Sequence, residues 1–484
     1  MLAWVLGMHL VVWSVLPLLV CYNLQLDLIE GLALGKEWQL GYWKHPPLPW
    51  WIDDLAFRAA GDPRVVYVLG PAACVIALYA VWRLGRAVVG EQSALIAVLA
   101  LEGLHFLNFT AVKFNHDVLQ LPLWALTGLF VFRAIDKGRA ADWIWSGVWL
   151  ALAFWTKYSA VALGAPIGLF LLFDPFARRT WRTSGPYLLA GAFLLVIAPH
   201  LWWLVEHGFI PLDYAAARAR VAIHWYEYLE FPLRWTASQL VFLAPTLALL
   251  AVVLLGAARS EAPRDPRAAF MRNYVTVLAL GPFLLITLGA GLLGRLVVAM
   301  WGYPLWLFAP LAAVSWFGPV LAPQRARLFA RACIVVLLAM PAAYVADEVL
   351  EPFLRDRPKA TQFPGKLLAE TLTSRWHALT GTPLIYVVQF GSSGAGEFAT
   401  NNVAVYSSDR PHVVAYGKLD LSPWIDPADF DRRGGVMVWE GPVPSDLLSQ
   451  FPHAELQPPL ILPRQTLYPR PPLVINYAWL RPQP

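Results

Sequence analysis

Long apolar runs dominate this chain, and they limit the folds open to it more than any other feature. Stretches of about 17–25 apolar residues can cross a bilayer as a helix. About eleven such runs lie at 2–20, 65–83, 93–109, 118–132, 143–155, 160–173, 187–204, 240–255, 274–291, 297–316 and 328–346. Charged residues form 14% of the chain, against about 25% in soluble proteins. We therefore expect a polytopic α-helical membrane protein with about eleven (10–13) spans and exclude a disordered chain.

Basic residues occupy alternate connections between these runs. The basic connections contain Arg83 and Arg86; Arg133, Lys137 and Arg139; Arg178, Arg179 and Arg182; Arg259, Arg264, Arg267 and Arg272; and Arg325, Arg327 and Arg331. Because positive loops stay in the cytoplasm, we expect the N-terminus and these connections to be cytoplasmic. No Lys or Arg precedes Lys36, so the first run is expected to be a retained helix and not a cleaved signal peptide.

The composition changes after residue 348. Residues 349–484 are rich in proline and contain no run long enough to span a membrane. Strand-sized apolar runs at 383–390, 403–406, 412–416, 435–439 and 473–477 alternate with helical pieces at 365–379, 395–401 and 445–451. This alternation is typical of a small α/β domain. We expect a membrane domain at 1–348 and an extracytoplasmic (periplasmic) α/β domain at 349–484, in a bacterial inner-membrane protein.

The first outer loop, residues 22–64, is expected to contain interfacial helices and carries the most distinctive motif. Asp27 and Glu30 follow the first span, and then comes Tyr42-Trp-Lys44-His45-Pro-Pro-Leu-Pro-Trp-Trp51. The aromatic residues suit a segment that lies at the bilayer surface, and the paired prolines fix the backbone. The alternative is that this run is only an interfacial anchor and that Asp27 is a solvated helix end.

The other outer connections also carry polar residues at helix ends. The second contains Asn115, His116 and Asp117, where the acid is either catalytic or an N-terminal helix cap. Lys157 lies in a short turn and either reaches the interface or binds an anion. Arginines suit anionic head groups, although they equally form the solvated face of a helix. The remaining candidates are Tyr158, His207, Arg218, Arg295 and Trp301.

Glu102 and His105 lie three residues apart, which is expected to place them on one helix face inside the third span. We interpret them as structural hydrogen-bonding residues of the bundle. All three cysteines (Cys21, Cys74 and Cys333) lie in apolar runs, which excludes a disulfide framework and a thiolate metal cluster. The sequence contains no P-loop, nucleophile elbow or HExxH pattern.

With these residues in view, the chain resembles the membrane-embedded glycosyltransferases of the GT-C type that use polyprenyl-phosphate sugars. The similarity is to the bacterial protein-mannosyltransferase-like group, which includes the aminoarabinose and galacturonic acid transferases that act on lipid A. The first outer loop, Asn115-His116-Asp117, the Lys157-Tyr158 turn, residues 199–209 and Trp301-x-x-Pro304 carry the resemblance, in the family's order. It covers roughly residues 1–320.

The resemblance implies a GT-C bundle whose active site lies at the outer membrane face. The first-loop acid of the family, its expected general base, corresponds to Asp27, and the second-loop acid corresponds to Asp117. Family members usually have Asp-Glu at the first position, where this chain has Asp27-Leu28. The lipid A aminoarabinose transferases have Lys before the first proline, where this chain has His45 after Lys44.

These observations predict an inverting glycosyltransferase that moves a sugar from a polyprenyl phosphate to a lipid A, lipopolysaccharide, other envelope glycan or protein hydroxyl. We expect the donor phosphate to bind Lys44, His45, Lys157, Arg218 and Arg295. Substrate contacts are expected from Glu30, Tyr42, His116, Tyr158, His207 and Trp301. The sequence requires no cofactor; a divalent cation, if one binds, is expected at Asp117 and His116. We expect no nucleic-acid partner.

Two other classes compete with this hypothesis. A membrane transporter or flippase requires charged residues along a path through mid-bilayer, and only Glu102 is that deep in the expected spans. The absence of an internal repeat gives no support to an inverted-repeat transporter. A non-catalytic scaffold that displays the C-terminal domain is disfavoured by the two outer acids and the basic residues beside them.

Overall fold

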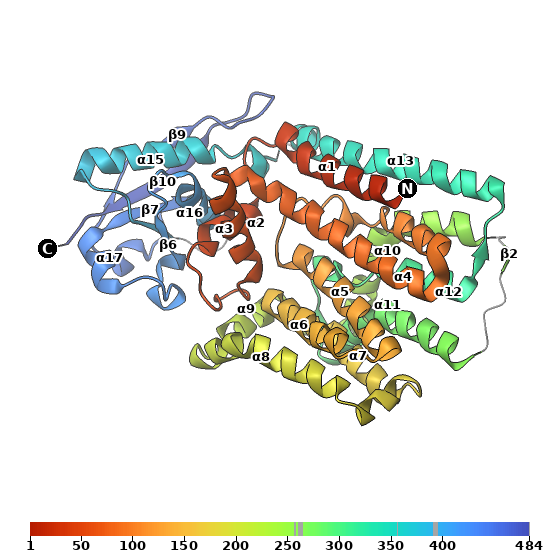
Figure 1. Ribbon diagram of the computed structural model, residues 1–484. Coiled ribbons are helices and arrows are strands. Elements are labelled where there is room, and N and C mark those ends of the chain that lie inside the picture. Colours follow the sequence, from red (N-terminus) through yellow and green to blue (C-terminus); the bar gives the residue numbers. More distant parts are fainter. Residues whose placement is uncertain (256–257, 260–264, 356, 391–394, 484) are drawn as a thin grey trace. The chain divides into compact units, whose positions relative to one another are not determined.

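The computed structural model describes residues 1–484 except 256–257, 260–264, 356, 391–394 and 484 (Figure 1). The chain divides into two compact units. The first comprises Met1–Val15, Trp43–Leu48 and Tyr67–Tyr344, and the second comprises Leu16–Tyr42, Pro49–Val66 and Val345–Pro484. The expected boundary at 348 places the whole first loop with the membrane part, whereas most of that loop belongs to the second unit.

Helices make up nearly all of the first unit (Figure 1). They are α1 (Leu2–Val20), α4 (Leu69–Leu101), α5 (His116–Lys137), α6 (Ala140–Thr156), α7 (Val161–Phe173), α8 (Gly185–Glu206), α9 (Ile210–Arg218), α10 (Glu227–Leu254), α11 (Pro266–Leu292), α12 (Ala309–Phe317) and α13 (Pro323–Val349). The last residues of α1 and α13 belong to the second unit. Two-stranded pairs join β1 (Arg220–Val221) to β3 (Arg295–Leu296) and β2 (Ala258–Arg259) to β4 (Pro319–Val320).

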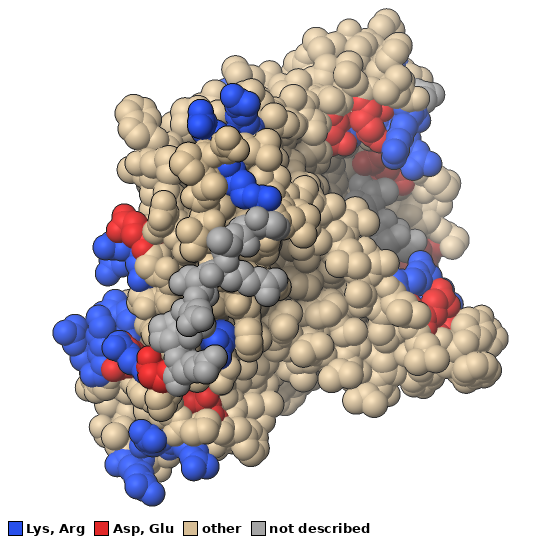
Figure 2. Space-filling view, turned by 90° about the vertical axis from the view of Figure 1, so that its right-hand side faces the viewer, with Lys and Arg blue, Asp and Glu red and all other residues tan. Residues whose placement is uncertain are grey.

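Seven helical segments in the described residues are long and apolar enough to cross a membrane: α1, α4 with the 3-10 turn before it, α5, α8, α10, α11 and α13. Helix α5 is largely buried, between α4 and α6. By contrast, α1, α8 and α13 expose most of their apolar surface, as lipid-facing helices do. Figure 2 looks onto the side of the molecule on which β2 lies in Figure 1; Lys and Arg side chains form several clusters there, with Asp and Glu beside some of them and uncharged surface between.

Helix α4 contains the second and third expected spans. It breaks at Gly90, whose φ of 79° is favourable only for glycine. A Cβ on Gly85 would lie 2.8 Å from the Cβ of Ala94, so the two arms of α4 fold back against each other. The second arm ends at Leu101. Glu102 and His105 therefore do not share a helix face, which corrects the expectation from their spacing.

The expected span at 297–316 is also corrected. The segment begins with the 3-10 turn Ala299–Gly302, and only α12, nine residues long, is α-helical. A helix of that length rises about 14 Å, too short to cross the hydrocarbon core alone. Pro304 and Pro310 explain the interruption, because proline lacks the N–H that a continuous helix requires.

The second unit contains a six-stranded sheet with order β6-β5-β7-β10-β8, and β9 also pairs with β10. Strands β5, β6 and β7 are parallel, and β10 runs antiparallel to its neighbours. The strands are β5 (Tyr386–Gln389), β6 (His412–Val414), β7 (Gly435–Glu440), β8 (Ala454–Leu456), β9 (Leu460–Leu462) and β10 (Leu473–Leu480). The helices are α2 (Leu26–Gly35), α3 (Leu48–Ala60), α14 (Glu351–Arg355), α15 (Gly365–Thr380), α16 (Ala395–Tyr406), α17 (Pro427–Arg433) and α18 (Leu447–Gln450).

Strands thus alternate with helices after residue 380, but the apolar run at 403–406 is the end of α16 and not a strand. Helix α2 packs against α16. Asn23 donates a hydrogen bond to Asn402 (2.9 Å) and accepts one from Tyr406 (2.8 Å). Beyond the other end of α2, Glu37 pairs with His412 at 2.9 Å. These contacts tie the first-loop helix that carries Asp27 to the sheet unit.

Three of the basic connections, those after α5, after α10 and before α13, lie together at one end of the bundle. Asp136, in the last turn of α5, pairs with Arg267 at the start of α11 (2.9 Å). Arg325, at the start of α13, donates to the carbonyl oxygen of Val252 near the end of α10 (3.2 Å). Arg264 lies outside the described residues. The 22 residues of α5 separate this end from Asp117 by about 33 Å at 1.5 Å per residue.

Candidate active site

Three of the predicted polar residues, Asn115, His116 and Asp117, lie at the start of α5. The side-chain oxygen of Asn115 accepts hydrogen bonds from the backbone N–H groups of Asp117 (2.9 Å) and Val118 (3.0 Å). Asn115 is therefore the helix cap. The alternative that Asp117 caps the helix does not apply, because Asp117 uses its side chain elsewhere.

Asp117 forms an ion pair with Lys157, which lies in the turn after α6. The Nζ–Oδ1 distance is 2.6 Å, and the two side chains are only 12% and 14% exposed. The same ammonium lies 5.5 Å from the centroid of the Trp301 ring. Lys157 is thus held in place by an acid and an aromatic ring from two other segments, and it does not extend into the interface as a mobile surface lysine.

The histidines of the first and second outer segments meet beside this pair. Nε2 of His116 is 3.0 Å from the carbonyl oxygen of Pro46, and the rings of His45 and His116 are 4.2 Å apart. Tyr214, on α9, packs edge-on against His45 at 5.5 Å. The Lys44-His45-Pro46-Pro47 motif is therefore fixed against the start of α5.

Positive charge surrounds His45. Removal from water, then the neighbouring His116 and the charges of Lys157, Lys44 and Arg218, hold the pKa of His45 well below its usual range. His45 is therefore neutral at pH 7 and offers a hydrogen bond but no charge. Lys44 is 7% exposed and lies 5.7 Å from the ring centroid of Trp43. The motif thus adds a largely buried cation to a region that already contains Lys157 and Arg218.

Three further predicted residues have contacts of their own. Tyr158 Oη lies 3.1 Å from Nε2 of His200 on α8. His207 stacks on Trp203 with ring centroids 4.3 Å apart, one turn earlier in the chain. Arg295 donates from Nη1 to the carbonyl oxygens of Ala216 and Ala219, both at 3.2 Å. Arg295 therefore holds the backbone at the end of α9, on either side of Arg218.

Asp27, Glu30 and Tyr42 belong to the second unit, so they are described with it. Asp27 lies in the first turn of α2 and is half-buried, as is Glu30. The positive end of the helix dipole favours the ionised form of an acid in that position. Tyr42 is buried; it donates to the carbonyl oxygen of Leu34 (2.9 Å) and packs against the ring of Trp50.

Sequence reasoning missed Asp53, on α3. Its side chain is fully buried, and both of its carboxyl oxygens lack a hydrogen-bond partner among the residues that the structure describes. The adjacent Asp54 bonds to Trp38 and Arg58. The available signal was the pair of acids inside an otherwise apolar-aromatic helix, one turn after two tryptophans.

Among the described residues, no group of three or more His, Cys, Asp or Glu side chains is arranged to hold a metal ion. Asp117, which is expected to hold a cation if one binds, has the ammonium of Lys157 beside it.

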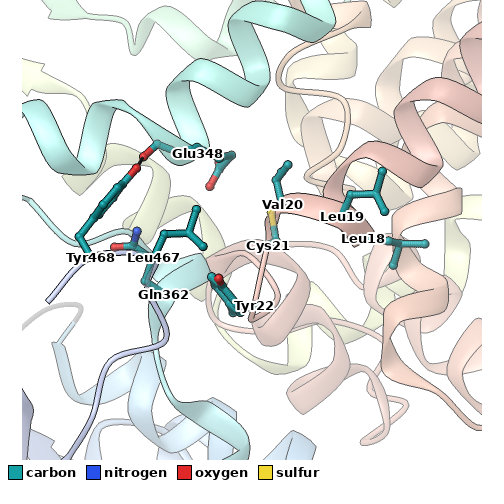
Figure 3. Close-up of a pocket in the computed structure, with 10 residues that line it drawn as sticks. Leu18, Leu19, Val20, Cys21, Tyr22, Glu348, Gln362, Leu467 and Tyr468 are labelled. Carbon is teal, nitrogen blue, oxygen red and sulfur yellow. Dashed lines mark hydrogen bonds between the residues drawn. The ribbon is translucent and has the colours of Figure 1, made fainter. Parts of the chain in front are cut away.

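Two cavities lie within the second unit, apart from the predicted residues. One, of about 270 Å³, is lined by Leu18–Tyr22, Glu348, Val349, Gln362, Leu467 and Tyr468. Figure 3 shows the residues from the ends of α1 and α13 facing one another across it, with Tyr468 hydrogen-bonded to the backbone of Val349. The other, of about 510 Å³, lies beside α17 and the end of β10.

Comparisons with known proteins agree with this architecture. Residues 44–203 match the dolichyl-phosphate-mannose-protein mannosyltransferase family. The chain is 25% identical to the lipid A galacturonosyltransferase RgtD of Rhizobium johnstonii over 219 residues, 44% of this chain and 45% of that protein. It is 24% identical to the lipopolysaccharide core galacturonosyltransferase RgtB of the same organism over 341 residues, 66% of each. The matches thus span about half to two thirds of these curated relatives.

The fold is similar to that of ArnT from Cupriavidus metallidurans bound to undecaprenyl phosphate. The TM-score is 0.63 at 14% identity, and the alignment covers 98% of both chains. This likeness defines a GT-C fold for the described structure. Together, the family match, the two relatives and the fold support a GT-C-type glycosyltransferase of the membrane.

Proposed function

We propose that this protein transfers a sugar from a polyprenyl-phosphate donor to a hydroxyl group of lipid A, lipopolysaccharide or another envelope glycan, with inversion at the anomeric carbon. The observation that carries the proposal is the cationic group of Lys44, Lys157 and Arg218 around the neutral His45. Similarity to transferases that act on lipid A and on lipopolysaccharide core supports the acceptor class. The fold it has in common with a structure bound to undecaprenyl phosphate supports the donor class.

The positive residues suit a phosphate leaving group. A lipid phosphate departs as an anion and needs no acid to protonate it, whereas fixed cations stabilise the charge that develops on its oxygens. Lys157 is pre-positioned by Asp117 and Trp301, so little reorganisation is needed when the donor binds. Lys44 and Arg218 complete the site, and His45 contributes a neutral hydrogen-bonding group.

Asp27 supplies the other half of the chemistry. An acceptor hydroxyl must lose its proton as it attacks, and a carboxylate at the start of a helix stays ionised to receive it. In the proposed step the acceptor oxygen bonds to the anomeric carbon, and the bond from that carbon to the phosphate oxygen breaks. Its electron pair leaves on the phosphate, and the acceptor proton passes to Asp27. A single displacement of this kind inverts the anomeric centre.

The test is transfer by the purified protein in liposomes that contain a labelled polyprenyl-phosphate sugar and a lipid A acceptor. We expect Asp27→Asn to reduce transfer at least a hundred-fold, in line with the contribution of a general base. Asp62→Asn is the matched control, because Asp62 is a half-exposed acid of the same loop whose carboxylate pairs with Arg64. Its transfer rate is expected to equal that of wild type.

Near-normal transfer by Asp27→Asn would remove Asp27 as the base while leaving the transferase intact. A folded wild-type protein that moves the intact lipid-linked sugar across the bilayer, and transfers nothing, would identify the transporter class instead. Sugars from the uronic acid, aminopentose and neutral hexose classes, each on the same lipid, define the donor in this assay.

A further inference from the structure

Asp53 is a fully buried acid that the proposed reaction does not use. Its side chain has no exposed surface, and neither carboxyl oxygen has a hydrogen-bond partner in the described part of the chain. Burial of an unpaired carboxylate costs several kcal/mol or more, and such groups usually stay neutral. An acid in this state retains an O–H group, and no hydrogen bond of the described residues uses it.

Close packing of α2 and α3 sets the position of this acid. A Cβ on Gly31 would lie 2.1 Å from Oδ2 of Asp53, and one on Gly35 would lie 2.0 Å from the carbonyl oxygen of Trp50. The carboxyl group of Asp53 therefore lies directly against the backbone of α2. Residues four apart share a helix face, so Asp27, one turn before Gly31, is on the face that Asp53 contacts.

The charges around Asp53 act in the same direction. Burial first, and then the nearby carboxylates of Asp27 on α2 and Asp54 on α3, raise the pKa of Asp53 well above its usual range. Asp54 has hydrogen-bond partners that Asp53 lacks, because Arg58 (2.6 Å) and Trp38 (2.8 Å) donate to its side chain. The raised pKa of Asp53 favours its neutral form beside Asp27.

We propose that Asp53 is a positioning residue for Asp27, and that its buried O–H group orients and stabilises the Asp27 carboxylate while the acceptor binds. The inference rests on the proposed role of Asp27 as the general base. Between them the two acids carry one proton in the resting enzyme, and Asp53 holds it. The acceptor proton is then received by Asp27, and Asp53 keeps its own.

The first test compares Asp53→Asn with Asp53→Leu through the pH dependence of kcat/KM for the acceptor. Asparagine keeps a donor group, so we expect its acidic limb to coincide with that of wild type. Leucine removes the donor and makes the ionised form of Asp27 less favourable. The acidic limb of Asp53→Leu is therefore expected to move to higher pH by about one unit. Below that limb, kcat/KM for the acceptor should be roughly ten-fold lower than in wild type. Equal limbs in both variants would overturn the proposal.

The second test needs no activity and separates the two hypotheses. Aspartate in an unfolded chain has a pKa of about 3.9, so folding at neutral pH requires Asp53 to take up a proton. Wild-type stability is therefore expected to fall as pH rises from about 4 toward the raised pKa, and Asp53→Asn lacks this loss. The melting temperature of Asp53→Asn should exceed that of wild type increasingly from pH 4.5 to pH 7.5.

The opposite result is a melting temperature of Asp53→Asn that falls further below that of wild type as pH rises. It would show that Asp53 is ionised and partnered, and it would overturn the inference. Failure of the proposed function has a different signature. If Asp27→Asn transfers sugar normally, Asp27 is not the base, whatever the melting data show. If Asp27→Asn is inactive and the leucine and asparagine limbs coincide, only the role of Asp53 is rejected.

Discussion

Lys157 is held in place by two other segments, at the end of the bundle where α5 begins. It reaches Asp117 at 2.6 Å and the Trp301 ring at 5.5 Å, and it is 12% exposed. An ammonium so fixed loses little side-chain entropy when an anion arrives. The pairing also explains why an acid stands beside a proposed phosphate site, because Asp117 holds the lysine in place and offsets its charge before the donor binds.

Replacement of this lysine gives the residue-scale prediction. We expect Lys157→Met to raise KM for the polyprenyl-phosphate donor about ten- to hundred-fold, because a lost charge-assisted hydrogen bond is worth about 1.5–3 kcal/mol. KM for the acceptor should change little. The measurement is a steady-state titration of donor at saturating acceptor in liposomes.

Lys137→Met is the control for that titration, since Lys137 is exposed at the opposite end of α5. An unchanged donor KM in Lys157→Met, with correctly folded protein, would exclude Lys157 from the donor site.

At the scale of helices, the close packing of α2 against α3 depends on Gly31 and Gly35, four residues apart on α2. Both face α3 so closely that a methyl group at either position would overlap it. Their absence of side chains lets a helix with a first-turn acid lie directly on Asp53 and Trp50. The arrangement places the proposed general base Asp27 and the buried Asp53 on two adjoining helices of the same unit.

Gly35→Ala tests this packing. A Cβ there would lie 2.0 Å from a backbone carbonyl oxygen of α3, which cannot rotate away. We expect destabilisation by about 1–3 kcal/mol, the usual cost of overpacking, seen as a lower melting temperature in detergent. Gly191→Ala is the control: Gly191 lies on α8 with no atom within 4 Å of its built Cβ, so its melting temperature should be unchanged or higher. A Gly35→Ala protein as stable as wild type would contradict the packing argument.

The elements also show what sequence patterns can predict here. Hydropathy located α1, α5, α8, α10, α11 and α13 because each is a long, continuous apolar helix. The span predicted at 297–316 was wrong, because prolines interrupt the helix there. The strand predicted at 403–406 was also wrong, because an apolar run of four residues fits a strand and a helix equally well. The contact of Lys157 with Asp117 depends on tertiary packing, so no sequence pattern records it. For Asp53 the sequence shows only two acids in an apolar-aromatic helix, and which of the two is buried without a partner also depends on packing.

For the whole molecule, the two ends of the bundle have different chemical character. Asp136, Arg267 and Arg325 bring three of the basic connections to one end, and α5 separates them from the start of that helix, where Asp117 and Lys157 meet. By the positive-inside rule we propose that the protein is oriented with the proposed site toward the periplasm. Most of the first loop belongs to the second unit, whereas Trp43–Leu48 belongs to the first.

Cysteine labelling of intact cells tests this orientation. Asp213→Cys, at an exposed position on α9, should react with a membrane-impermeant maleimide in spheroplasts. Arg139→Cys, exposed before α6, should react only after permeabilisation. The reverse pattern would place the proposed site in the cytoplasm. Native Cys74 and Cys333 are buried, and a background without Cys21 removes the remaining half-buried thiol.

The most direct measurement of the central claim is the product balance of the purified protein in liposomes. Mass spectrometry counts the polyprenyl phosphate released and the glycosylated acceptor formed, and NMR determines the anomeric configuration of the new bond. We predict one polyprenyl phosphate per transferred sugar and an inverted anomeric centre, with both products reduced at least a hundred-fold in Asp27→Asn. Transfer with retained configuration, or no transfer by the folded protein with any polyprenyl-phosphate sugar, would contradict the claim.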